Sequence, residues 1–304
     1  MKRVCVLMST YNGERYIREQ IDSVLRQKGV MVTLLIRDDG SSDKTISIIE
    51  EYSHSNTNID FILGDNVRPA KSFIELIKLA PKAEYYALCD QDDVWEENKL
   101  FAAVEKICEL NSDKPVLYYS NLKIVDKDLN FYRLSHNSVM YNANKYSALT
   151  ENLCTGCTAV FNYVVKELIE QKPPAYCTMH DTWIYMMCML LGEVYYDKNA
   201  YIMYRQHDNN VVGTYLKKNR FMSFYEHFIR LFDKELQPRY KNAVSFYESY
   251  GNELDEESKD KVLKVVNYKN SLKAKFRLLT DKKIRATTLF GNIRFVCLVL
   301  LGRA

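Results

Sequence analysis

The first half of the chain alternates short apolar runs with segments whose apolar residues recur at helical spacing, and this pattern constrains the fold more than any other feature. The apolar runs predict strands at 3–9, 32–37, 59–63, 85–89 and 116–119. The segments between them predict helices at 14–27, 43–52, 70–79 and 96–110. Parallel strands joined by helices produce this order. The sequence therefore predicts an α/β sandwich around a mostly parallel central sheet.

The second half of the chain is less regular. Longer polar connections run to about residue 152, followed by an apolar run at 158–161, a helix near 181–191 and strands at 194–196 and 201–204. From residue 221 onward the spacing is helical, with no glycine between Gly251 and Gly291. We therefore expect an α/β domain over residues 1–215, built from halves at about 1–115 and 116–215, and a helical region over 216–304.

Charge is distributed unevenly, although the net charge is only +3. Residues 261–304 contain eleven Lys or Arg and one acid, Asp281, so the rest of the chain is acidic. Three interpretations of this basic segment are open: the solvated face of a helical bundle, an interfacial helix attracted to anionic lipids, or a nucleic-acid surface. The acidic body and the absence of a nucleic-acid motif argue against the third. We favour the membrane surface and expect no nucleic-acid partner.

The cysteines and the apolar runs indicate the cellular compartment in which the protein is expected. Eight cysteines without regular spacing are typical of reduced thiols in a cytosolic protein. The single CxxC pair, Cys154 and Cys157, is weak evidence for a metal or redox site. No signal peptide is recognised, and the longest uncharged apolar stretch, 295–301, is far shorter than the ~20 residues of a spanning helix. We expect a cytoplasmic protein, peripheral at the inner face of the plasma membrane.

Polar clusters follow three of the predicted strands. They are STYNG at 9–13, DDGSSD at 38–43 and DQDDVW at 90–95. Each cluster alone could be a turn with a helix cap. Ligands of an open parallel sheet bind at the carboxyl ends of its strands, and three successive clusters there are harder to explain as turns. The sequence therefore predicts a binding site at this edge of the sheet.

Asp90, Asp92 and Asp93 are the sharpest feature of this site. Three carboxylates within four residues repel one another, and such a group is normally neutralised by a divalent cation. Oxygen ligands favour Mn²⁺ or Mg²⁺ over zinc, and such a cation commonly also binds substrate phosphates. The chain has neither GxGxxG after its first strand nor GxxxxGK followed by Ser or Thr. This argues against a dinucleotide oxidoreductase and a P-loop NTPase.

Six motifs carry a resemblance to a known family: MSTYNGERYIREQIDSVLRQ, IRDDGSSDKT, LCDQDDVWEENKL, TGCTAVFN, HDTWIY and YRQHDNNVVG. Over residues 1–213 the chain resembles the family 2 inverting glycosyltransferases of the GT-A fold. Among them it is most similar to the rhamnosyltransferase-like branch that builds bacterial cell-surface polysaccharides. The resemblance implies a nucleotide-diphospho sugar bound by the 1–115 half, an acceptor bound by the 116–215 half, and a helical C-terminal region.

The resemblance also implies roles for single residues. Tyr11 would stack on the nucleotide base, and Asp39 would accept a hydrogen bond from the imide nitrogen of that base. The pocket around the base would be lined by Ser9 and Thr10. The D-x-D element, which contacts the ribose and binds the metal bridging the phosphates, would comprise Asp90, Asp92 and Asp93.

Three further residues complete the predicted site. Asp181 occupies the position where the family keeps the base that removes the acceptor proton, and its place at a predicted helix start would also suit an N-cap. His180 beside it could orient Asp181 or have no chemical role. His207 could bind the metal or donate to the diphosphate, whose charge grows as the sugar leaves, and Arg205 would share that second role. A solvated loop residue is the alternative for His207.

The sequence thus predicts an inverting, metal-dependent hexosyltransferase with Mn²⁺ or Mg²⁺ as cofactor. By analogy its donor is dTDP-L-rhamnose, although a UDP-sugar would meet the same aspartates. The acceptor is expected to be a hydroxyl of a growing cell-surface polysaccharide or lipid-linked oligosaccharide. One alternative is an inactive family member that acts as a scaffold in a polysaccharide assembly complex. Another is a nucleotidyltransferase or sugar-nucleotide hydrolase, which would show a glycine-rich, Arg-bearing loop after the first strand.

Overall fold

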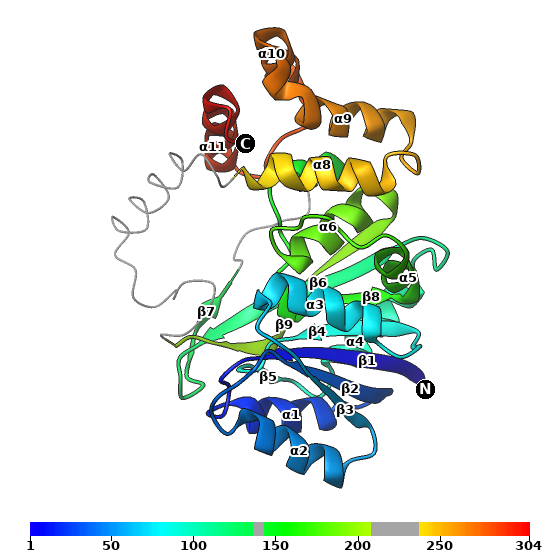
Figure 1. The fold of residues 1–304 in the computed structure, drawn as a ribbon, viewed down its shortest axis with the longest axis vertical. Coiled ribbons are helices and arrows are strands. Elements are labelled where there is room, and N and C mark those ends of the chain that lie inside the picture. Colours follow the sequence, from blue (N-terminus) through cyan, green and yellow to red (C-terminus); the bar gives the residue numbers. More distant parts are fainter. Residues whose placement is uncertain (136–142, 208–236) are drawn as a thin grey trace.

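The computed structural model describes residues 1–135, 143–207 and 237–304, and its central feature is one sheet (Figure 1). Nine strands within these residues form it, in the order β3-β2-β1-β4-β8-β6-β9-β5, with β7 paired to β6 outside this path. Pairs around β1 are parallel, whereas β5, β7 and β8 pair antiparallel with their neighbours. The predicted α/β sandwich is confirmed. The strands are β1 Lys2–Thr10, β2 Val30–Asp38, β3 Ile59–Leu63, β4 Tyr85–Cys89, β5 Val94–Trp95, β6 Val116–Val125, β7 Phe131–Leu134, β8 Val160–Asn162 and β9 Glu193–Arg205.

The ends of three strands coincide. β1 lies between β2 and β4 and runs parallel to both, with Thr10 paired to Asp38 and Met8 paired to Cys89. β1, β2 and β4 therefore end side by side. The three polar clusters that follow them meet at one edge of the sheet, as the sequence predicts.

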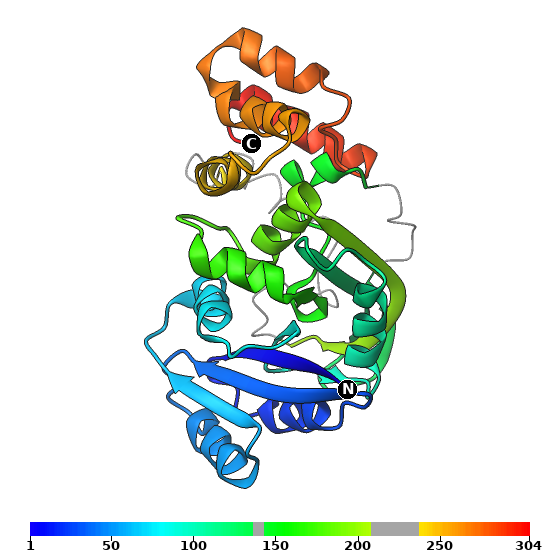
Figure 2. The same cartoon turned by 90° about the vertical axis from the view of Figure 1, so that its right-hand side faces the viewer.

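Helices cover both faces of the sheet (Figures 1 and 2). Alternate residues of β1 point into two cores, with Val4 and Val6 on one side and Cys5 and Leu7 on the other. Burial on both faces explains why β1 is a continuous apolar run. The helices of the first side are α1 Ile17–Leu25, α2 Thr45–Ser55 and α4 Lys99–Cys108, and those of the second are α3 Arg68–Leu79, α5 Tyr163–Gln171 and α6 His180–Leu191.

The two strands predicted at 194–196 and 201–204 form one strand, β9, so that prediction is wrong. Asp197 lies in its middle, where its carboxylate accepts hydrogen bonds from the Tyr118 hydroxyl over 2.9 Å and from the Asn199 N–H over 2.8 Å. A register shift opposite Ser120 and Asn121 absorbs these polar residues. Such an irregularity bends a strand without ending it.

Among the strands and α-helices of the described residues, β5, β7 and α5 were not predicted. β5 has two residues and pairs with Ile202 and Met203 of β9. A strand of two residues is too short to show an alternation of apolar and polar residues in the sequence. It exists because it pairs with β9 in the folded structure.

The chain after residue 237 is helical, as predicted, and lies beyond α6 in both views (Figures 1 and 2). Trp183 of α6 contacts Phe246 and Tyr250 of α8, with ring centroids 5.6 and 6.2 Å apart. All three belong to one core, so these helices pack directly on the sheet domain. The predicted boundary near residue 215 lies outside the described residues. The C-terminal helices are α8 Pro238–Tyr250, α9 Glu256–Asn267, α10 Leu272–Thr280 and α11 Leu289–Leu301.

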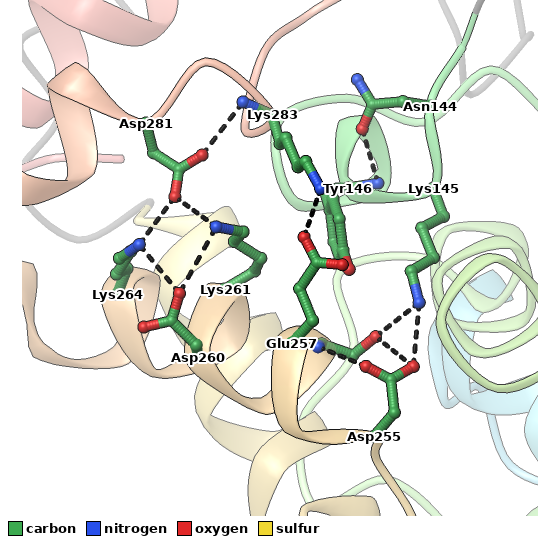
Figure 3. A network of polar contacts seen from close by, with 11 residues as sticks. Asn144, Lys145, Tyr146, Asp255, Glu257, Asp260, Lys261, Lys264, Asp281 and Lys283 are labelled. Atoms are coloured by element: carbon green, nitrogen blue, oxygen red, sulfur yellow. Dashed lines mark hydrogen bonds and ion pairs between the residues drawn. The ribbon is translucent and has the colours of Figure 1, made fainter.

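Part of the positive charge of the C-terminal region is paired within that region (Figure 3). Asp281, at the end of α10, accepts hydrogen bonds from Lys261 over 2.8 Å and from Lys264 over 2.7 Å, both on α9. Lys283 pairs with Glu257 over 2.5 Å. These lysines join α9 to the segment after α10. The basic surface predicted from the sequence is therefore smaller than the count of Lys and Arg suggests.

Candidate active site

A cavity of about 940 Å³ lies at the carboxyl ends of β1, β2 and β4, and residues after β9 and at the start of α6 complete its wall. Most of the site residues predicted from the sequence line this cavity, whereas Asp93 and Arg205 do not. Segments far apart in the chain thus meet at one place. The predicted residues in the lining are Ser9, Thr10, Tyr11, Asp39, Asp90, Asp92, Asp181 and His207.

Tyr11 lines the cavity with about half of its surface exposed, at 49%. Gln91, in the loop after β4, holds the Tyr11 backbone: its Oε1 accepts the Tyr11 N–H over 2.9 Å, and its Nε2 donates to the Tyr11 carbonyl over 3.0 Å. A Cβ added at Gly13 would lie only 2.3 Å from Gln91 Oε1, so glycine makes room for this side chain. The sequence analysis did not single out Gln91, because an amide inside an acidic motif looks like a spacer.

Asp39 lines the cavity from the loop after β2. Its Oδ1 pairs with the Arg37 guanidinium and accepts a hydrogen bond from the Ser72 hydroxyl over 2.8 Å. Its Oδ2 accepts the Val67 N–H over 3.3 Å. These contacts hold the carboxylate in one orientation at the cavity wall.

The hydroxyls of Ser9 and Thr10 have protein partners. Ser9 Oγ lies 2.7 Å from Ser72 Oγ, and Thr10 donates to Asp38 Oδ2 over 2.9 Å. Asp38 is fully buried and also accepts the N–H of Gly40 over 3.0 Å, in a turn where Gly40 has a φ of +80°. Ser9 and Thr10 therefore shape the wall of the cavity rather than present free hydroxyls to it.

Of the five described aspartates that line the cavity, three interact through their charges: Asp90 and Asp92 after β4, and Asp181 in the first turn of α6. Burial, and after it the charges of Asp92 and Asp181, raises the pKa of Asp90 to about 7. Burial raises the pKa of Asp181 to about 6, although the Thr182 N–H donates to it over 2.6 Å. The N-cap of α6 is Met179, so Asp181 is not the helix cap. Mutual repulsion of this kind favours the binding of a cation.

Asp93 is fully buried and lies outside the lining of the cavity. Its Oδ1 accepts the Arg205 N–H over 3.1 Å, and its Oδ2 has no hydrogen-bond partner among the described residues. Asp90, Asp93 and Cys157 place possible ligand atoms within 4.8 Å of one another. Burial raises the pKa of the Cys157 thiol well above its ordinary value, which disfavours a thiolate ligand. Asp93 thus lies outside the cavity lining, although its carboxylate is close to that of Asp90.

Arg205 is 2% exposed, and its guanidinium binds protein atoms. It donates to the carbonyl of Asp92 over 2.9 Å and to that of Lys127 over 2.6 Å, and it pairs with Glu19 over 2.5 Å. Arg205 thereby joins the end of β9 to the loop after β4. His207, two residues further, does line the cavity, and its Nε2 lies 2.8 Å from Asp92 Oδ2.

Three cations that the sequence analysis did not single out also line the cavity: Arg15, Arg68 and Lys127. Arg68 has a φ of +68°, a left-handed conformation that costs free energy in a residue other than glycine. Asn66 supports it by accepting the Arg68 N–H over 3.1 Å. Single basic residues in turns or at the start of a helix form no pattern, so nothing in the sequence distinguishes them. The cavity therefore combines carboxylates for a cation with basic groups for an anion.

Comparison with solved structures identifies the fold. S. aureus TarS 1-349 in complex with UDP-GlcNAc matches with a TM-score of 0.55 and 17% identity, over 98% of this chain and 90% of that one. The mannosyltransferase PcManGT from Pyrobaculum calidifontis, in complex with GDP-Man and Mn²⁺, matches with a TM-score of 0.51 and 16% identity, over 100% of this chain and 88% of that one. The sheet and its helices have the GT-A architecture, which confirms the predicted fold class.

Sequence comparison identifies the family. The model of glycosyl transferase family 2 matches residues 5–169. The dTDP-rhamnosyl transferase RfbG of Shigella flexneri is 31% identical over 225 residues, 68% of this chain and 73% of that protein. The UDP-Glc:alpha-D-GlcNAc-diphosphoundecaprenol beta-1,3-glucosyltransferase WfgD of Escherichia coli is 27% identical over 157 residues, 52% of this chain and 58% of that protein. The chain belongs to glycosyl transferase family 2, in its rhamnosyltransferase-like branch, and is a glycosyltransferase that uses a nucleotide-sugar donor.

Replacing Gln91 by Leu should weaken nucleotide binding, because the variant keeps the volume but loses both hydrogen bonds to the Tyr11 backbone. Each such bond contributes about 0.5–1.5 kcal/mol, so we expect the Kd of a nucleoside diphosphate to rise about tenfold in calorimetry. Gln27→Leu is the matched control, because Gln27 donates to the Glu96 carbonyl over 2.7 Å and does not line the cavity. It should lower stability and leave the Kd unchanged. An unchanged Kd in Gln91→Leu would contradict this role.

Proposed function

We propose that this glycosyltransferase transfers a sugar, with inversion, from dTDP-L-rhamnose to a hydroxyl of a growing cell-surface polysaccharide or lipid-linked oligosaccharide, with Mn²⁺ or Mg²⁺ as cofactor. The observation that carries the proposal is that Tyr11, Asp92 and Asp181 line one cavity. The relative named as a dTDP-rhamnosyl transferase supports the donor. The relative whose name includes diphosphoundecaprenol supports a lipid-linked acceptor. A UDP-sugar is the alternative donor.

The nucleotide would bind where Tyr11 and Asp39 line the cavity. The half-exposed ring of Tyr11 offers a face for stacking on the base, and Asp39 would accept a hydrogen bond from the imide nitrogen. The charge of the diphosphate would be met by Arg15, Arg68 and Lys127. Arg205 is not used in this way, because its guanidinium already binds Glu19 and two carbonyls.

A divalent cation fits the residues around Asp92. Carboxylate oxygens and an imidazole nitrogen are ligands that Mn²⁺ accepts, and a cation would relieve the repulsion that contributes to the raised pKa of Asp90. Asp92 and His207 would hold the ion, with Asp90 beside them. Asp93, which is buried outside the lining but lies close to Asp90, would support the backbone at Arg205 rather than bind the ion. When bound, the ion would neutralise charge on the departing diphosphate.

Asp181 would act as the base. Its carboxylate would take the proton of the acceptor hydroxyl while that oxygen attacks the anomeric carbon opposite the leaving diphosphate, which inverts the configuration. A pKa of about 6 makes Asp181 a stronger base than an ordinary aspartate, and it is still ionised at neutral pH. The alternative of an inactive scaffold is not favoured, because the acids that the reaction needs line one cavity together.

The acceptor side of the proposal includes a membrane surface. No helix in the described part of the chain is both long and apolar enough to cross a bilayer. α10 and α11 lie at the end of the molecule away from α1 and α2 (Figure 1), and both expose apolar side chains. Those more than half exposed are Leu272, Phe276, Leu289, Phe290, Ile293 and Leu300.

Charge supports an anionic lipid surface as the partner of these helices. Lys273, Arg277 and Lys282 are exposed within the same segment. Asp281, the one acid in residues 261–304, is paired with lysines of α9. Apolar side chains flanked by cations, without a free carboxylate, are attracted to an anionic interface. We propose that α10 and α11 dock at the inner face of the plasma membrane, where a lipid-linked acceptor would be found.

Asp92→Asn should lower turnover by at least ~100-fold, because the cation supplies several kcal/mol of transition-state stabilisation. EDTA should abolish wild-type activity, and Mn²⁺ or Mg²⁺ should restore it. Asp93→Asn is the matched variant: its amide oxygen can still accept the Arg205 N–H, so the Mn²⁺ concentration for half-maximal activity should stay at the wild-type value. Full activity in excess chelator would contradict a metal at Asp92.

The kcat of the wild type should fall as the pH drops through about 6, because protonated Asp181 cannot accept the proton of the acceptor. An ordinary aspartate, with a pKa of about 3.9, would keep the activity to a lower pH. Thr182→Val removes a hydroxyl 3.3 Å from Asp181 Oδ1 that lowers this pKa, so the acid limb should move to higher pH. Asp181→Asn should reduce kcat by ~10²-fold or more with donor Kd unchanged. Near-normal kcat in that variant would exclude Asp181 as the base.

The combined variant Phe276→Ser, Phe290→Ser, Ile293→Ser should bind anionic vesicles at least about tenfold more weakly than the wild type, because each buried side chain of this size contributes ~1.5–3 kcal/mol. Co-sedimentation with vesicles of phosphatidylglycerol and phosphatidylcholine measures this. Phe131→Ser is the matched control, since Phe131 on β7 is also exposed, at 62%. Added salt should weaken wild-type binding. The docking surface would be refuted if the wild type did not co-sediment with these vesicles. It would also be refuted if the triple variant bound them as tightly as the wild type.

A further inference from the structure

His180, the first residue of α6, has a buried polar side chain without a hydrogen-bond partner among the described residues. It is 3% exposed, and neither Nδ1 nor Nε2 is hydrogen-bonded within the described residues. Buried polar groups in folded proteins nearly always have a partner, because leaving one unpaired costs free energy. His180 nevertheless belongs to the lining of the cavity. A partner supplied by a bound ligand would account for both facts.

The chemistry of this imidazole narrows the choice of ligand group. Burial lowers the pKa of His180 to about 3, so the ring is neutral at physiological pH. A neutral imidazole has one N–H donor and one acceptor nitrogen. A sugar hydroxyl can form a hydrogen bond with either nitrogen, because it both donates and accepts. An ionised phosphate only accepts hydrogen bonds, and the cations of the cavity bind it more strongly than a neutral ring does. His180 therefore suits an uncharged hydroxyl.

The position of His180 indicates which hydroxyl it would meet. Its ring packs on Phe73, with centroids 4.0 Å apart and an angle of 31° between the planes. Phe73 follows Ser72, whose hydroxyl donates to Asp39 over 2.8 Å, and Asp181 follows His180. The imidazole is thus linked through Phe73 to the helix that holds Asp39 and through the chain to the proposed catalytic base. The sugar of the donor has to lie between the nucleotide base, which Asp39 would bind, and the catalytic base, because its anomeric carbon joins the diphosphate to the acceptor.

Gly156 leaves space beside the imidazole. A Cβ added at this position would lie 2.9 Å from His180 Nε2, too close for an ordinary contact. Both residues line the cavity. Glycine at 156 therefore leaves the place beside this nitrogen that a side chain of residue 156 would occupy.

We propose that His180 binds a hydroxyl of the donor sugar ring and so contributes to the choice of sugar. This inference rests on the proposed function, since it takes the ligand to be a nucleotide-diphospho sugar. His180 would act in binding and would not exchange a proton during the reaction.

The test compares the nucleotide with and without its sugar. The Kd of dTDP and that of dTDP-L-rhamnose are measured by calorimetry with Mn²⁺ and without acceptor. His180→Phe keeps a ring on Phe73 and removes both nitrogens, so we expect an unchanged Kd for dTDP and a roughly tenfold higher Kd for dTDP-L-rhamnose. His180→Asn, which keeps a donor and an acceptor, should recover part of the difference.

Donors that lack one ring hydroxyl identify the group that His180 contacts. In the wild type, removal of that hydroxyl from dTDP-L-rhamnose should raise the Kd about tenfold, as expected for a lost hydrogen bond with a buried partner. In His180→Phe the same removal should have no effect, because the partner is already absent. Removal of the other hydroxyls should have equal effects in both proteins.

The outcomes separate this inference from the proposed function. If His180 only packs, His180→Phe should leave both Kd values unchanged and raise the thermal midpoint, since it removes two unpaired buried nitrogens, and this result would overturn the inference. Equal weakening of dTDP and dTDP-L-rhamnose would also overturn it. If the wild type binds neither dTDP-L-rhamnose nor UDP-GlcNAc, UDP-Glc or GDP-Man, the proposed function fails and the inference fails with it. If another of these donors binds, the same comparison is made with that sugar and its own nucleoside diphosphate.

Discussion

The parallel pairing of β1 with β2 and β4 is the constraint on which the active site depends. It ends the three strands at one level and brings their loops together. Gln91, after β4, holds the backbone of Tyr11, after β1, and Ser72 of α3 holds the carboxylate of Asp39, after β2. The part of the cavity proposed for the nucleotide and the part that contains the acids are therefore joined by hydrogen bonds. A displacement of one loop would displace the other.

Several carboxylates lie at the same edge of the sheet and repel one another. The structure places them in two different environments. Asp93 is turned into the protein, where the backbone N–H of Arg205 meets it. Asp90 and Asp92 are left at the cavity, where burial and neighbouring charge raise the pKa of Asp90 to about 7. In the proposed mechanism a bound cation would neutralise the carboxylates. The diphosphate would in turn be neutralised by the cation and by the basic residues of the cavity.

Helix α6 links the active site to the C-terminal helices. Its first turn contains His180 and Asp181, and further along the same helix Trp183 packs on Phe246 and Tyr250 of α8. A surface on α10 and α11 that docks on lipid would thus be connected through a packed core to the residues proposed to bind the sugar and take the proton. The orientation of the cavity relative to a membrane would follow from this packing.

The sequence by itself determined the alternation of strands and helices from β1 to β6 in the first half of the chain, except for β5, the polar clusters at the strand ends and the position of Asp181 at the start of a helix. These features depend on local periodicity and short motifs. Only the tertiary structure decided that Asp92 faces the cavity while Asp93 is buried, that Arg205 binds carbonyls and Glu19, and that Gln91 holds Tyr11. Neighbouring carboxylates in one loop look alike in a sequence. Which of them reaches the cavity is set by the hydrogen bonds between that loop and Arg205 of β9. Arg205 is 112 residues away from Asp93 in the sequence, so local sequence patterns cannot predict this contact.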